Sequence, residues 1–152
     1  MIANEGDWKG GTRGFTIFNR DGSVSYESGP SFEMHVARAG HYPDKRSDAK
    51  GVEPEGLEVA RFGDDDLIFV LSERGSVVGV YRDTGGEPEF LQLLPSGISP
   101  EGAVAIPGRN LLATANEADL VEDGAARSHV MLFERSEGKP AYPQLVLSLI
   151  HI

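Results

Sequence analysis

The feature that most constrains this 152-residue chain is an internal repeat of strand-like segments. The tripeptide Pro-Glu-Gly occurs at 54–56 and again at 100–102, 46 residues apart. Three apolar segments follow each copy. The second segment is followed by Glu, and the third ends in an aromatic residue next to a charged residue. A shorter copy of this pattern begins at residue 2. A period in the forties without helical periodicity is typical of β-propellers, in which each blade is a four-stranded sheet.

We therefore predict an all-β chain that forms a β-propeller fragment of about two and a half to three four-stranded antiparallel blades, of the WD40/YVTN-like kind. The blades are expected at about 1–32, 54–95 and 100–146. The strands of the middle blade are predicted at about 57–61, 67–72, 77–82 and 89–94. Those of the third blade are predicted at about 103–106, 111–116, 129–134 and 144–147. A solenoid or a plain β-sandwich is the alternative. Closed propellers have about 4–8 blades, so these segments are too few to close a ring.

A long insertion at 33–53 separates the first two blades. Irregular insertions of this length are usually functional or disordered. This one is locally basic, whereas the whole chain has 24 acidic residues against 14 Lys and Arg. Its basic residues are His35, Arg38, His41, Lys45, Arg46 and Lys50.

Composition excludes several classes of function. A net charge of −10 makes nucleic acid an unexpected partner, because phosphate binding needs a basic face. The absence of Cys excludes disulfides, zinc–thiolate sites and Cys nucleophiles. No apolar run reaches about 18 residues, so no membrane span is expected. The chain also lacks G-x-S-x-G, P-loop and H-E-x-x-H motifs.

The last six residues, 147–152, read Leu-Ser-Leu-Ile-His-Ile and resemble a translated sequencing adapter. We interpret them as a non-native tail; a final apolar strand is the alternative. In the first case the chain is a truncated fragment, and the lack of a signal sequence or anchor says nothing about where the whole protein resides.

Aromatic residues recur at the ends of the predicted strands. We expect Phe15, Phe18, Phe69, Tyr81 and Phe133 to pack between blades. Trp8, the only Trp, is expected to pack there too; a platform for a sugar or a partner is the alternative.

Carboxylates also recur at equivalent positions. Glu5, Glu73 and Glu117 end equivalent strands, and Glu55 and Glu101 follow the repeated Pro. If rotation relates the blades, equivalent residues form rings around one axis. Such a ring is costly without cations or Arg, because like charges in a partly dry site repel each other.

Three interpretations of these carboxylates remain open. In the first, Arg13, Arg46 and Arg74 pair with them, and Glu side chains accept backbone N–H bonds from the next blade. In the second, an acidic mouth binds Ca²⁺, which takes six to eight oxygen ligands. The candidate metal ligands are Glu5, Glu53, Glu55, Glu73, Glu101 and Glu117. In the third, cations of the insertion hold a phosphoester beside the metal. The candidate ligand-binding residues are Arg13, Lys45, Arg46, Asp48, Lys50 and Arg74.

Several segments, taken in order, resemble a known family. They are 3–7, 13–17, 26–29, 44–56 and 72–74. Together they resemble the choice-of-anchor I family of bacterial surface propellers, related to mesenchyme-specific cell-surface glycoprotein-like proteins and, more loosely, to phytase-like esterase domains. The resemblance covers about residues 2–135 and is most specific over 46–56. This chain has Val52 where the family more often has Pro, and its 4–13 span is short, which could remove a ligand.

The resemblance implies a seven-bladed type of propeller that is exported and tethered by a variable C-terminal anchor. We therefore expect an extracellular or cell-surface binding module for an unknown surface ligand or protein. The alternative is a calcium-dependent phosphoesterase of the alkaline-phosphatase or phytase-like kind, because some relatives carry alkaline-phosphatase labels. The resemblance identifies no catalytic residue.

Overall fold

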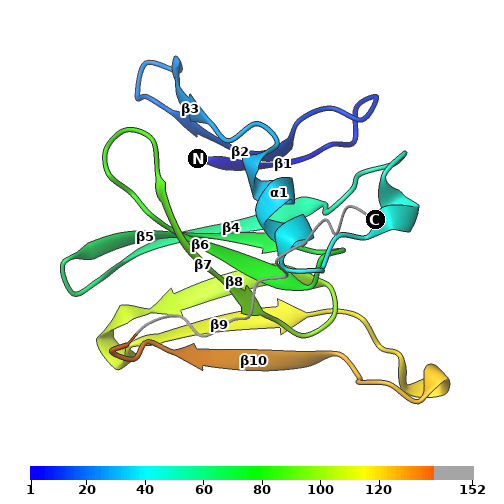
Figure 1. Cartoon of the computed structure of the whole chain (residues 1–152). Helices are drawn as coiled ribbons and strands as arrows, with labels where there is room; N and C mark the ends of the chain where they lie inside the picture. The colour runs from blue at the N-terminus through cyan, green and yellow to red at the C-terminus, as the bar shows by residue number, and fades with distance from the viewer. Residues whose placement is uncertain (139–152) are drawn as a thin grey trace, which may run out of the picture.

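The computed structural model describes residues 1–138, whose strands form three antiparallel sheets stacked face to face (Figure 1). The first sheet contains β1 (Ile2–Glu5), β2 (Arg13–Phe18) and β3 (Val24–Glu27). The middle sheet contains β4 (Pro54–Phe62), β5 (Asp65–Ser72), β6 (Val77–Arg82) and β7 (Glu89–Pro95). The third sheet contains β8 (Pro100–Ile106), β9 (Leu111–Asn116) and β10 (His129–Glu134).

The predicted all-β, propeller-like class is confirmed. Within each sheet, neighbouring strands are consecutive in the chain, which is the connectivity of propeller blades. β4 packs against β1 on one side and β8 on the other, so the strands that open the blades lie together. The three sheets form no closed ring in the described part of the chain. The strand predicted at 144–147 and the tail at 147–152 lie outside the described residues.

The repeat in the sequence is also a repeat in strand register. In each sheet, the residue immediately before the recurrent Glu pairs with the first or second residue of the next strand. These pairs are Asn4 with Gly14, Ser72 with Val77, and Asn116 with His129. Positions counted from these pairs are therefore structurally equivalent in the three sheets.

Two apolar cores lie between the sheets. The first, between the first and middle sheets, contains Phe15, Phe32, Val36, Val52, Ile68, Val70, Val77, Tyr81 and Leu93. The second, between the middle and third sheets, contains Phe62, Leu67, Phe69, Leu71, Val78, Val80 and Leu112. β6 contributes to both cores, because successive side chains of a strand point to opposite faces. The middle sheet is thus buried on both sides.

The insertion is more ordered than the sequence suggested, because its first part is the helix α1 (Ser31–Arg38), which lies beside the first and middle sheets (Figure 1). Phe32 and Val36, four residues apart, occupy one face of this helix and are fully buried in the first core. Gly79 has no side chain and so makes room for Phe32, because an added Cβ at Gly79 would lie 2.7 Å from Cε2 of Phe32. Burial of two large side chains therefore overrides the irregular structure expected here. The remaining short turns are 3₁₀ helices: η1 (Asp44–Arg46), η2 (Pro107–Arg109) and η3 (Val121–Asp123).

The aromatic predictions are only partly right. Phe15, Phe69 and Tyr81 are buried, and Phe133 is half-buried against the second core. Phe18, in contrast, is 41% exposed, because it lies on the face of the first sheet that points away from the middle sheet. Among residues 1–138, no helix has the length and apolarity that crossing a membrane requires.

Candidate functional site: a cluster of carboxylates and cations

The recurrent carboxylates meet at one end of the stacked sheets. Glu5 closes β1, and Glu73 and Glu117 directly follow β5 and β9. Glu55 and Glu101 lie at the second position of β4 and β8. Because the sheets stack with these ends side by side, the fold gathers acidic residues that are far apart in the chain.

The backbone around two of these positions is the same in both repeats. The Glu73 amide donates to the Glu53 carbonyl over 2.9 Å, and the Glu117 amide donates to the Ser99 carbonyl over 2.9 Å. Glu53 and Ser99 both adopt left-handed backbone conformations, with φ of 52° and 56°. Such conformations cost about 1–3 kcal/mol for residues other than Gly, so the surrounding structure must stabilise them.

Glu53 is the centre of an ion-pair cluster. Its side chain is only 2% exposed, and three cations surround it. Arg46 Nη2 lies 2.5 Å and Arg74 Nε 2.9 Å from Oε2, and Lys50 Nζ lies 2.6 Å from Oε1. Burial alone would raise the pKa of Glu53, but the bonds from Lys50 and Arg74 outweigh it and lower the pKa to about 2. We call this group, with its neighbours Glu5, Asp7 and Glu73, the Glu53 cluster.

Lys50 links Glu53 to the first sheet. Its Nζ also contacts Glu5 Oε1 and lies 3.1 Å from Asp7 Oδ1. Hydrogen bonds to Glu5, Glu53 and Asp7 raise the pKa of Lys50, so its ammonium stays charged. Carboxylate oxygens of Glu5, Glu53 and Glu55 lie within 4.8 Å of one another, a spacing that suits a metal ion. The ammonium already bridges two of these three carboxylates.

Glu73 is a second buried carboxylate, 2% exposed. Its Oε1 lies 2.7 Å from Arg74 Nη1, but the contact lacks hydrogen-bond alignment. Burial, a hydrogen bond with Glu55 and the charge of Glu53 together raise the pKa of Glu73 to about 8. Two neighbouring buried carboxyl groups thus differ in protonation near neutral pH. Glu53 is ionised, whereas Glu73 is largely protonated and neutral.

The acidic group continues toward the third sheet. Desolvation, followed by the charges of Glu117 and Glu55, raises the pKa of Glu101, although much of its side chain remains exposed. The predicted metal ligands are therefore neighbours, from Glu5 through Glu53, Glu55 and Glu73 to Glu101 and Glu117. Within residues 1–138, close cations pair with Glu5, Glu53 and Glu73 but form no salt bridge with Glu55, Glu101 or Glu117.

Arg13 of the first sheet also binds the insertion, through hydrogen bonds to its backbone carbonyls. Arg13 donates through Nη2 to the Ala49 carbonyl over 2.6 Å and through both terminal nitrogens to the Ser47 carbonyl over 3.1 Å. Its Nη1 lies 3.7 Å from Glu33 Oε1. Gly51, at φ 57°, allows this packing, because an added Cβ would lie 2.2 Å from Glu33 Oε1. Arg13 therefore clamps the insertion onto the first sheet.

The structure divides the candidate ligand-binding residues into two groups. Arg13, Arg46, Lys50 and Arg74 are engaged in the contacts above. Lys45 and Asp48 are exposed and form no salt bridge within the described residues. Sequence reasoning assigned no role to Asp7, which lies in the loop after Glu5, or to the helical Glu33; neither belongs to the repeat that revealed the other carboxylates.

Trp8 does not pack between blades as expected. Its side chain is 80% exposed in the loop between β1 and β2, and Lys9 Nζ lies 5.5 Å from its ring centroid. The tight turn of this short loop keeps the Trp8 ring away from the sheets. Gly6, Lys9 and Gly10 all adopt positive φ, and the Gly11 amide donates a hydrogen bond to the Trp8 carbonyl. Trp8 therefore lies outside both apolar cores of the described residues.

A comparison with known families agrees with the resemblance seen in the sequence. The model of the choice-of-anchor I domain matches residues 4–86, which is more than half of the chain. This chain belongs to the choice-of-anchor I domain family. The match includes every residue of the Glu53 cluster of this choice-of-anchor I domain, from Glu5 to Arg74. No curated protein and no solved structure matches the chain significantly.

Proposed function

We propose that this choice-of-anchor I domain is a non-enzymatic binding module of a propeller-type protein that is exported and anchored at the cell surface. The family description, with its reference to anchoring, supports a surface-associated role. In this proposal the Glu53 cluster is a structural latch. It holds the loop at 6–12 and the insertion in place, and the exposed side chains of those two segments contact the partner.

The observation that carries this proposal is the internal neutralisation of Glu53. A phosphate clamp needs cations that are free to bind an anion, and a metal site needs carboxylates that are free to bind a cation. Here Arg46, Lys50 and Arg74 are all within 3 Å of one buried carboxylate. The cations that could bind a phosphate and the central carboxylate that could bind a metal are thus paired with each other.

The exposed residues near the latch are suited to recognition. Trp8 offers an apolar platform, and Lys45 and Asp48 offer charged groups on the adjacent insertion. An exposed ring flanked by polar groups is a common way to bind a sugar or a peptide surface. The expected ligand is therefore a surface glycan or a protein segment.

Trp8 also provides the test, because the only Trp in the chain reports on this loop alone. Titration with soluble cell-wall glycan fragments should shift or quench its emission. The same titration followed by calorimetry should lose its heat in Trp8→Ala and weaken in Lys45→Ala. The distant Val121→Ala variant, in an exposed 3₁₀ turn, should bind like the unsubstituted chain. Unchanged emission with glycans and with peptide libraries would contradict a binding role for this loop.

A calcium-dependent phosphoesterase is the second candidate, and one observation favours it. The oxygens of Glu5, Glu53 and Glu55 are close enough to share a cation, and Arg46 lies beside them. The test is turnover of p-nitrophenyl phosphate and phytate with and without Ca²⁺. Turnover that requires Ca²⁺ and is lost in both Glu55→Ala and Arg46→Ala would favour the enzyme over the binding module.

A further inference from the structure

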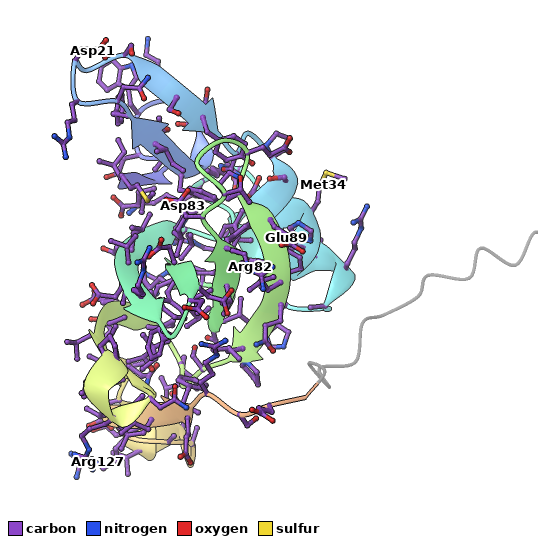
Figure 2. The ribbon with its side chains drawn as sticks, turned by 90° about the vertical axis from the view of Figure 1, so that its left-hand side faces the viewer. Asp21, Met34, Arg82, Asp83, Glu89 and Arg127 are labelled. Atoms are coloured by element: carbon purple, nitrogen blue, oxygen red, sulfur yellow. The ribbon has the colours of Figure 1, made fainter. Side chains whose placement is uncertain are left out.

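The insertion has two parts, which different forces hold on the fold. The first part is α1, whose Phe32 and Val36 are fully buried in the first apolar core. Met34, on the other side of the helix, is 49% exposed and points away from the sheets (Figure 2). Burial of apolar side chains therefore holds α1 in place, and dissolved ions do not screen this force.

The second part of the insertion, residues 43–51, lacks such an anchor, and we call it the strap. None of its residues belongs to either apolar core of the described chain. The residues on both sides of it do contact a core: Tyr42 packs against the first core, and Val52 is fully buried within it. The strap is therefore a loop that apolar burial fixes only at its two ends.

Charged side chains hold the strap against the first sheet and the loop that follows β1. Within residues 1–138, every hydrogen bond and salt bridge across this contact contains one. Arg13 of β2 donates to two carbonyls of the strap, and Lys50 of the strap contacts Glu5 and Asp7. The side chains of Lys50 and Arg46 are 27% and 37% exposed, so dissolved ions can reach and screen them.

The loop that follows β1 depends on the same cations. Lys50 Nζ lies 3.1 Å from Asp7 Oδ1 in this loop. Gly6, the first residue of the loop, packs on the stem of Arg13, because an added Cβ at Gly6 would lie 2.9 Å from Cγ of Arg13. A movement of the strap that separates it from these side chains therefore removes contacts of the loop as well.

We propose that the strap and the loop that follows β1 form one unit, which opens as ionic strength rises while α1 stays docked. Screening weakens the contacts that close the unit and stabilises the separated charges of the open form. The ionic strength of the surroundings thereby regulates the surface that the proposed function assigns to the partner. The inference rests on the latch of the proposed function, but it needs no ligand.

Hydrogen exchange of single amides, followed by NMR in about 0.05 M and about 1 M sodium chloride, tests this device. Ala49 and Gly51 report on the strap, because their amides donate to the Arg46 carbonyl. Gly11 reports on the loop, because its amide donates to the Trp8 carbonyl. The protection of all three amides should fall together by about tenfold at high salt.

Two amides of the helix provide the internal control. Met34 donates to the Pro30 carbonyl and Ala39 to the His35 carbonyl, and the protection of both should change by less than about twofold. An equal fall in the helix and the strap would mean that the whole insertion loosens, and unchanged protection of the strap would mean that charges do not hold it. Either result overturns the proposal. A strap that opens while Gly11 stays protected overturns its coupling to the loop.

Lys50→Met is the variant that tests the role of the central cation. At low salt its strap should exchange about as fast as the strap of the parent at high salt, and added salt should change it little. Lys45→Met is the matched control, because Lys45 is exposed and forms no salt bridge within the described residues, and it should respond to salt like the parent. A Lys50→Met strap with the protection and salt response of the parent would contradict the proposal.

Circular dichroism checks the strand content of both variants. If Lys50→Met fails to fold, the salt series of the parent alone decides the proposal. None of these measurements contains a glycan, so a flat salt response and a failed titration of Trp8 are separate results.

Discussion

Lys50 Nζ lies 2.6 Å from Oε1 of Glu53, three residues further along the chain, and this contact joins the insertion to the start of the middle sheet. The same nitrogen contacts Glu5 and lies 3.1 Å from Asp7 in the loop that follows the first strand. One ammonium group thus connects the first sheet, the insertion and the middle sheet. Its role as an internal cation explains why acidic residues can gather here in a chain of net charge −10.

Glu53→Gln should destabilise the fold by about 3 kcal/mol, because removing one partner of a buried ion pair leaves the opposite charges uncompensated. Arg46, Lys50 and Arg74 would all lose their shared carboxylate. Urea unfolding followed by circular dichroism measures the change. Glu27→Gln, on an exposed strand, is the control and should lie within about 0.5 kcal/mol of the parent. Equal stability of the two variants would show that the Glu53 cluster is not a latch.

Glu73 should make stability fall as pH rises from about 4.5 to about 8. Its pKa in the folded chain is about 8 and its ordinary value is 4.5, so in this window the folded chain holds a proton that the unfolded chain has released. The contribution of the protonated form is fully present below pH 4.5 and is lost as the pH passes 8. Glu73→Gln cannot ionise, so its melting temperature should decline less over the same window than that of the parent. Parallel curves for the two proteins would contradict the assignment.

Glu53 has the opposite dependence. Its pKa is lowered to about 2, so its stabilising contribution is present above pH 4.5 and is lost as the pH falls through 2. Acid unfolding of the parent, followed by near-ultraviolet circular dichroism, should therefore show a step in this window that Glu53→Gln lacks. An acid step of the same size in the variant would assign the transition to other carboxylates.

The repeat made much of this fold predictable, because strands and their turns are local signals. β6 lies where it was predicted, at 77–82, and β4 begins three residues earlier than expected, since pairing extends to the Pro of the motif. The equivalence of Glu73 and Glu117 was also visible in the sequence. The helix α1 was missed, because eight residues are too few to show a clear helical period, and only one pair at helical spacing, Phe32 and Val36, is buried.

The charge state and partners of the site could not be read in the same way. The sequence named Glu53 only as one of six candidate metal ligands, and its burial at the end of the insertion is a property of the fold. Lys45 and Arg46 are neighbours of the same charge type, yet only Arg46 reaches the buried carboxylate. Which of two adjacent cations turns inward depends on the geometry of the η1 turn, and no local signal in the sequence specifies it.

Lys50→Met should create a calcium site where the ammonium now lies. The substitution keeps an unbranched side chain but removes the cation between Glu5, Asp7 and Glu53, and their oxygens then repel one another. A hard cation with oxygen ligands relieves that repulsion, so Ca²⁺ should raise the melting temperature of the variant with an apparent Kd of about 1 mM. The parent and the exposed control Lys45→Met should show no such rise. A calcium response of the parent equal to that of the variant would show that Lys50 does not take the place of the metal.

Two equivalent glycines give a matched pair of tests for the stacking of the sheets. An added Cβ at Gly56 would lie 2.4 Å from the Glu101 carbonyl oxygen, a backbone atom that can move only if the third sheet moves. At the equivalent Gly102, an added Cβ would meet only the Ala115 Cβ at 3.9 Å. Gly56→Ala should therefore cost about 1–3 kcal/mol through overpacking, whereas Gly102→Ala should stay within about 0.5 kcal/mol of the parent. Urea unfolding measures both, and equal losses would mean that the middle and third sheets do not approach each other closely at Gly56.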